Sequence, residues 1–107
     1  MTPENVSAII DTVKGTVLPG ERIAMFNKAC AIDPHDTVVI EELSELIKAV
    51  SKINRCHNNK HLKSLMEEIA DVRIVIERIM YKYNIKEDDI DKLVVFKINR
   101  FIDQYGI

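Results

Sequence analysis

Apolar residues recur three and four positions apart along most of the chain, in segments separated by short polar or glycine-containing turns. This spacing is typical of amphipathic helices, and no segment alternates long enough to indicate a strand. We expect helices over about 3–14, 21–31, 34–54, 60–83 and 87–104. Asp33 and Pro34, with Asp36 completing a box-like cap, predict the start of the third helix, and Asn84 predicts the end of the fourth. The sequence therefore predicts an all-α protein, a bundle of four or five helices in one domain over residues 1–107.

The two central segments each combine an apolar stripe with an acidic pair. The stripe of segment 34–54 is Val39, Leu43, Leu46, Ile47, Val50 and Ile53. The stripe of segment 60–83 is Leu62, Leu65, Met66, Ile69, Val72, Ile76, Ile79, Met80 and Tyr83. Since residues turn by about 100° each, Glu42 and Glu45 lie roughly 70° and 130° from the centre of the first stripe. Glu68 and Asp71 lie roughly 80° and 140° from the second, with the same sense of rotation.

The short connection between these segments favours an antiparallel pair. Equal offsets then place both acidic pairs on one side, each about 12–14 Å from the turn. We therefore expect Glu42, Glu45, Glu68 and Asp71 to converge. Four carboxylates would repel one another unless a cation joined them, and an oxygen-only set suits Mg²⁺ or Mn²⁺ better than Zn²⁺. The alternative for either pair alone is a solvated polar helix face.

The acidic segments read EELSE, 22 further residues, then EIAD. This pattern resembles the EExxE…ExxD signature of all-α nucleotide pyrophosphohydrolases of the short MazG-like type, and the similarity extends from about Asp36 to Arg100. The resemblance implies that the four carboxylates hold Mg²⁺, which binds the phosphates of a nucleoside triphosphate. Water would then cleave between the α and β phosphates, giving monophosphate and pyrophosphate. Glu42 and Glu45 are both candidates for the general base.

The last predicted helix has a lysine among its apolar residues. Lys97 lies within its apolar stripe, where a lysine is costly unless it snorkels or meets an anion. We expect Lys97 and Arg100 to bind substrate phosphates, as the resemblance implies for basic residues in this helix; the alternative is a lysine stem packed over a core edge. A second apolar face (Val95, Ile98 and Ile102) predicts contact with another subunit. We therefore expect a homodimer or homotetramer.

Composition also limits the partners, the location and the cysteine chemistry that we expect of this protein. The formal net charge of −2 gives no electrostatic case for binding nucleic acid or a membrane. No signal peptide or membrane-spanning run is recognisable, so a cytoplasmic location is expected. Cys30 and Cys56 do not make a disulfide framework. Cys56, His57 and His61 would be a crowded zinc site, and an ordinary polar turn is the stronger interpretation.

The base and sugar of the substrate stay open. Phe26, Asn27 and His35 are candidates for base recognition because of their chemistry and their nearness in sequence to the acidic segments. One rival interpretation is a phosphoribosyl-ATP pyrophosphatase-like enzyme, and another is a non-catalytic helical oligomerisation or binding module. A ferritin-like di-iron bundle is disfavoured, because Asp71 stands where a Glu-x-x-His motif requires histidine.

Overall fold

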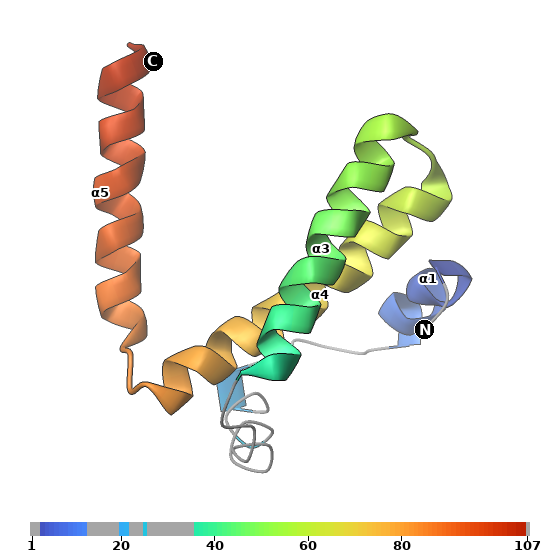
Figure 1. Ribbon diagram of the computed structural model, residues 1–107, viewed down its shortest axis with the longest axis horizontal. Coiled ribbons are helices and arrows are strands. Elements are labelled where there is room, and N and C mark those ends of the chain that lie inside the picture. Colours follow the sequence, from blue (N-terminus) through green and yellow to red (C-terminus); the bar gives the residue numbers. More distant parts are fainter. Residues whose placement is uncertain (1–2, 13–19, 22–24, 26–35, 107) are drawn as a thin grey trace.

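The computed structural model describes residues 3–12, 20–21, 25 and 36–106. Within these residues it contains no strand, and its helices are α1 (Pro3–Thr12), α3 (Thr37–Arg55), α4 (Asn59–Lys82) and α5 (Glu87–Tyr105) (Figure 1). The predicted all-α class is confirmed, with helix ends within a few residues of those expected. Most of the predicted helix 21–31 lies outside the described residues, as do Phe26, Asn27, Asp33, Pro34 and His35.

Helices α3 and α4 form an antiparallel hairpin with a tight turn between them (Figure 1). The side chain of Asn58 caps α4 by accepting a hydrogen bond from the His61 backbone N–H at 2.8 Å. His61 Nδ1 lies 2.6 Å from the Cys56 carbonyl oxygen. Both contacts of His61 stabilise the turn between α3 and α4. Among the described residues, Cys56, His57 and His61 do not form a metal-ligand group.

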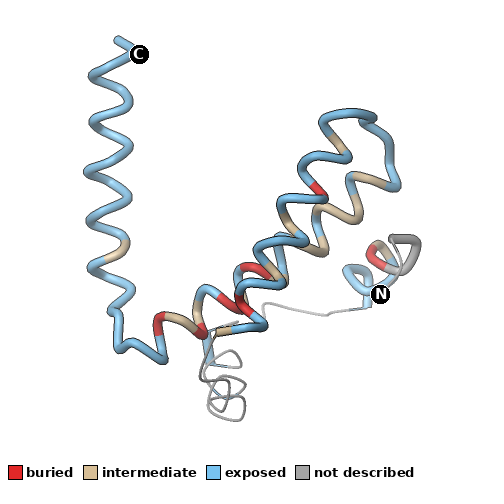
Figure 2. Tube along the Cα trace, in the orientation of Figure 1, coloured by how far each residue is buried: buried red, intermediate tan, exposed pale blue. Residues whose placement is uncertain are grey.

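The hairpin core contains small and medium-sized residues. Its buried apolar side chains are Val39 and Ala49 of α3 and Val72, Val75 and Met80 of α4. In Figure 2, buried segments (red) occur on α3, on α4 where it runs beside α3, and on the last part of α4. By contrast, Leu43, Ile47 and Val50 are exposed, although the sequence assigned them to the stripe that faces α4. The small residue Ala49 is buried at 5% exposure, whereas these larger side chains keep 40–70% of their surface exposed.

Helix α1 packs against the other side of α4, with Val6 buried in the contact. Lys63 Nζ donates a hydrogen bond to Ser7 Oγ across this contact. The apolar residues Val6, Ile9 and Ile10 of α1 thus lie toward α4, a neighbour that helical periodicity alone does not identify.

Asp36 precedes α3 in a left-handed conformation, with φ at 53°, and its side chain makes no capping hydrogen bond. The predicted role of Asp36 in a capping box is therefore wrong. Its carboxylate instead accepts hydrogen bonds from Lys82 Nζ at 2.8 Å and Tyr83 Oη at 2.7 Å. Asp36 thus joins the start of α3 to the end of α4.

Asn84 ends α4, as predicted. Its φ of 54° is left-handed, a conformation that asparagine tolerates better than most residues. The Ile85 backbone N–H then bonds to the Met80 carbonyl at 2.8 Å, as in a Schellman motif. The chain leaves this turn in a new direction and begins α5.

Helix α5 stands away from the hairpin (Figures 1 and 2). The extensive helix pairings among the described residues are α3 with α4 and α1 with α4, and no residue of Glu87–Tyr105 is buried. The acidic first turn of α5 favours its positive end, and Gly106 closes it with a φ of 64°. None of the described helices is both long and apolar enough to cross a membrane.

Candidate metal centre

Three carboxylates meet midway along the hairpin. Glu42 of α3, Glu68 of α4 and Asp71 of α4 each offer a carboxylate oxygen, and these oxygens lie within 4.8 Å of one another. Glu68 and Asp71 are three residues apart and so share one face of α4. Glu42 reaches them from the neighbouring helix. The structure thus brings together three of the four carboxylates whose convergence the sequence predicted.

Glu45 is not part of this carboxylate triad. Its side chain is exposed, and Lys48 Nζ lies 3.3 Å from its Oε1 on the same helix. Glu45 is still near enough for its charge to raise the pKa values of both Glu42 and Glu68. It is therefore a carboxylate at the edge of the triad, and its predicted ligand role stays a prediction.

Burial and mutual repulsion raise the pKa values of two triad members. The pKa of Glu42 is raised first by burial, then by the charges of Asp71 and Glu45, and by a hydrogen bond with Asp71. The pKa of Glu68 is raised first by burial, then by the charges of Asp71 and Glu42. The triad therefore holds its negative charge at a cost, which a bound cation would offset.

One oxygen of the triad is buried and unsatisfied. Glu68 Oε2 has no hydrogen-bond partner within the part of the chain that the structure describes. A buried polar atom without a partner is uncommon and calls for a ligand, ion or water to satisfy it. An all-carboxylate donor set fits the hard cations Mg²⁺ and Mn²⁺, and no histidine or cysteine accompanies the triad among the described residues.

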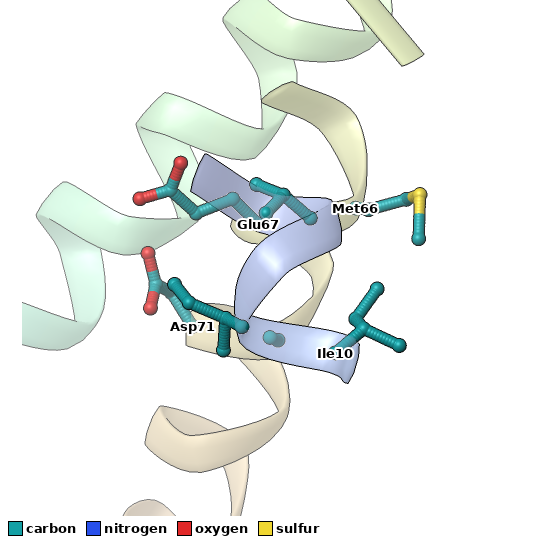
Figure 3. A pocket seen from close by; sticks show the side chains of 7 residues that line it. Ile10, Met66, Glu67 and Asp71 are labelled. Atoms are coloured by element: carbon teal, nitrogen blue, oxygen red, sulfur yellow. The ribbon is translucent and has the colours of Figure 1, made fainter. Parts of the chain in front are cut away.

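A hollow of about 260 Å³ adjoins the triad between α1 and α4. It is lined by Val6, Ile9, Ile10, Met66, Glu67, Ala70 and Asp71. In Figure 3 the carboxylates of Glu67 and Asp71 point toward α3, whereas Ile10 and Met66 lie on the opposite side. Asp71 belongs to both the hollow and the triad. The contribution of α1 to this neighbourhood was not foreseen, because its apolar residues predicted a helix face but not what that face covers.

The predicted phosphate-binding residues lie elsewhere. Lys97 and Arg100 line a shallow hollow on α5 together with Phe101 and Gln104. Arg100 also lies over the Phe96 ring, 5.8 Å from its centroid. Because α5 stands away from the hairpin, one described chain does not bring these cations to the triad (Figure 1).

The chain matches no model of a known protein family, and comparison with curated proteins and with solved structures gives no match either. The acidic motif and the arrangement of the triad are therefore the basis for a functional assignment.

Proposed function

We propose that this protein is a metal-dependent nucleotide pyrophosphohydrolase, which converts a nucleoside triphosphate to the monophosphate and pyrophosphate. The observation that carries the proposal is the triad of Glu42, Glu68 and Asp71 with its unsatisfied buried oxygen. The resemblance of EELSE and EIAD to the MazG-like signature supports the same assignment. Both observations concern the same residues, the first as a sequence pattern and the second as an arrangement in space.

Glu42, Glu68 and Asp71 would hold Mg²⁺ or Mn²⁺. Such an ion, when bound, supplies positive charge to the phosphates and lowers the pKa of a water beside it. Glu45 is the better placed of the two candidate bases, because its exposed carboxylate lies outside the triad and next to it. It would take a proton from the attacking water as the oxygen of that water adds to phosphorus and the α–β anhydride bond breaks.

The hollow between α1 and α4 would receive the base or sugar of the nucleotide. Its lining is mostly apolar, and it shares Asp71 with the triad. An apolar wall next to a phosphate-binding cation is a common arrangement of nucleotide sites, because the two ends of the ligand differ so strongly in polarity.

The proposal includes self-association. The exposed apolar side chains of α5 support it, because an apolar surface of this kind is typical of a contact with another protein chain. Binding of substrate phosphates by Lys97 and Arg100 stays a prediction.

Release of pyrophosphate from a panel of ribo- and deoxyribonucleoside triphosphates tests the proposal. We expect release with Mg²⁺ or Mn²⁺, none with EDTA, and loss of at least about 100-fold in Glu42→Ala. Glu41→Ala is the matched control, because Glu41 is the adjacent residue and is exposed. If the folded protein released pyrophosphate from none of the nucleotides, the result would contradict the proposed chemistry and favour a non-catalytic helical module.

A further inference from the structure

Helix α5 exposes its apolar side chains. None of its residues is buried, and its exposed large hydrophobic residues are Leu93, Val94, Val95, Phe96, Ile98, Phe101, Ile102 and Tyr105. Most helices in proteins gain their stability by packing an apolar face against other elements. The apolar surface of α5 therefore requires a partner.

Four of these residues form a stripe with heptad spacing. Val94, Ile98, Phe101 and Tyr105 follow one another at intervals of four, three and four residues. Phe101 and Tyr105 pack together within it, with ring centroids 4.5 Å apart. Intervals of three and four residues are the spacing by which one helix packs along another helix or helix pair.

The hairpin presents two stripes of the same kind. On α3, four exposed residues are spaced by three, four and three: Ile40, Leu43, Ile47 and Val50. On α4, three exposed residues are spaced by seven: Leu62, Ile69 and Ile76. The fully buried residues of the hairpin are at other positions.

Both hairpin stripes lie on one side of the hairpin. Relative to the buried residues of each helix, the exposed stripe is rotated by roughly 100° on α3 and roughly 90° on α4, in the same sense. Glu42 and Asp71 are rotated in the opposite sense, by roughly 20° and 70°. In an antiparallel pair, equal senses of rotation mean the same side. The two stripes therefore form one apolar face, which turns away from the carboxylates.

The chain is more extended than a compact monomer. It exposes 8657 Å², whereas a compact monomer of its mass, 12.3 kDa, exposes about 6,100 Å². The radius of gyration of 16.4 Å likewise exceeds the value of about 13 Å for a compact domain of this length.

Charge sets the direction in which α5 would lie. Between residues 46 and 66, around the hairpin turn, the chain has five lysines or arginines and no acidic residue. The start of α5, residues 87–91, has four acidic residues and no basic one. Placing the start of α5 at the hairpin turn joins these opposite charges and makes α5 parallel to α4.

This direction requires a second chain. Within one chain α5 begins near the end of α4, and α4 is 24 residues long, so the start of α5 lies about 36 Å from the hairpin turn. We propose that α5 of each copy docks on the apolar face of the α3–α4 hairpin of the other copy, with its acidic start at the partner's hairpin turn. In a two-fold dimer of this kind, the α5 stripe of each copy covers the hairpin face of the other copy. No apolar surface is then left to bind a third chain.

Sedimentation of the full chain tests the association. We expect a species of twice 12.3 kDa at micromolar concentration, and monomers for Ile98→Glu and for Ile47→Glu. Both residues are exposed in the single chain, so neither change disrupts its core. Phe96→Glu is the matched control: Phe96 is equally exposed on α5 but lies off the stripe, and this variant stays dimeric. A monomeric native chain, or equal effects of Phe96→Glu and Ile98→Glu, would overturn the proposal.

Disulfide formation tests the direction independently of any folding defect. Cys56 is a free, exposed thiol at the hairpin turn. In a Cys30→Ser background, Glu87→Cys should form an interchain disulfide with Cys56 when diamide accepts the two electrons and two protons released. Gln104→Cys, near the other end of α5, should not. Cross-linking through position 104 instead of 87, or through neither, would overturn the proposal. These residues lie outside the triad, so the outcome is separate from that of the proposed chemistry.

Discussion

The Asp36 carboxylate accepts a hydrogen bond from Lys82 Nζ at 2.8 Å, although 46 residues separate the two in sequence. Tyr83 Oη donates to the other carboxylate oxygen at 2.7 Å. Because Asp36 immediately precedes α3 and Lys82 ends α4, these bonds tie the open end of the hairpin together. The triad lies between this tie and the hairpin turn, so its two helices are fixed at both ends.

The tie makes the stability of the hairpin depend on pH. The hydrogen bonds from Lys82 and Tyr83 hold the pKa of Asp36 below its ordinary value. A carboxylate with a lowered pKa stabilises the fold above its unfolded pKa, and this contribution disappears as the pH falls through the lowered value. We expect Asp36→Asn to lower the Tm by a few degrees at pH 7 and to have little effect near pH 2, measured by circular dichroism. Asp88→Asn, which removes an exposed pair with Lys92 within α5, is the control. An equal loss at both pH values would contradict this role.

A second pH dependence, of opposite sign, is expected in the metal-free triad. The pKa of Glu68 is raised, so its contribution to stability is fully present below the unfolded pKa and is lost as the pH rises through the raised value. In EDTA, Glu68→Gln should therefore raise the Tm at pH 8 and change it little below pH 4. Glu41→Gln, which alters an exposed residue, should change the Tm little at either pH. A lower Tm for Glu68→Gln at pH 8 would show that repulsion and burial do not dominate at this position.

The hollow between α1 and α4 can be tested by partial filling. Ala70 lines the hollow, and Ala70→Met would occupy part of its volume of about 260 Å³. If the hollow receives the nucleotide, the KM should rise about tenfold while kcat stays within about twofold, as expected for a contact equally strong in the ground and transition states. Ala8→Met is the control, because Ala8 is exposed on α1. An unchanged KM would place the base and sugar elsewhere.

Much of the fold was predictable because it depends on local spacing. Helical periodicity gave α1, α3, α4 and α5 with their ends nearly in place, and Asn84 and Gly106 took the left-handed positions that end helices. The meeting of Glu42 with Glu68 and Asp71 also followed from local geometry. It required only the helical repeat and a short turn between two antiparallel helices.

The other features of the fold and of the triad depend on contacts between helices, which helical periodicity does not predict. The α3 stripe was assigned to a single neighbour, but Ala49 rather than Ile47 is buried against α4, because a small residue lets two helices approach closely. Asp36 was predicted as part of a cap, whereas its partners Lys82 and Tyr83 come from the far end of α4. The separation of Glu45 from the triad follows from its larger rotation away from the helix contact and its pairing with Lys48.

Binding of Mn²⁺ to the free protein, followed by electron paramagnetic resonance without nucleotide, would test whether the triad is a metal centre. We expect binding to the native chain and to Glu41→Gln, and at least about tenfold weaker binding to Glu42→Gln and to Asp71→Asn. Equal binding by all four proteins, or none by the native chain, would contradict the assignment of Glu42, Glu68 and Asp71 as a metal centre.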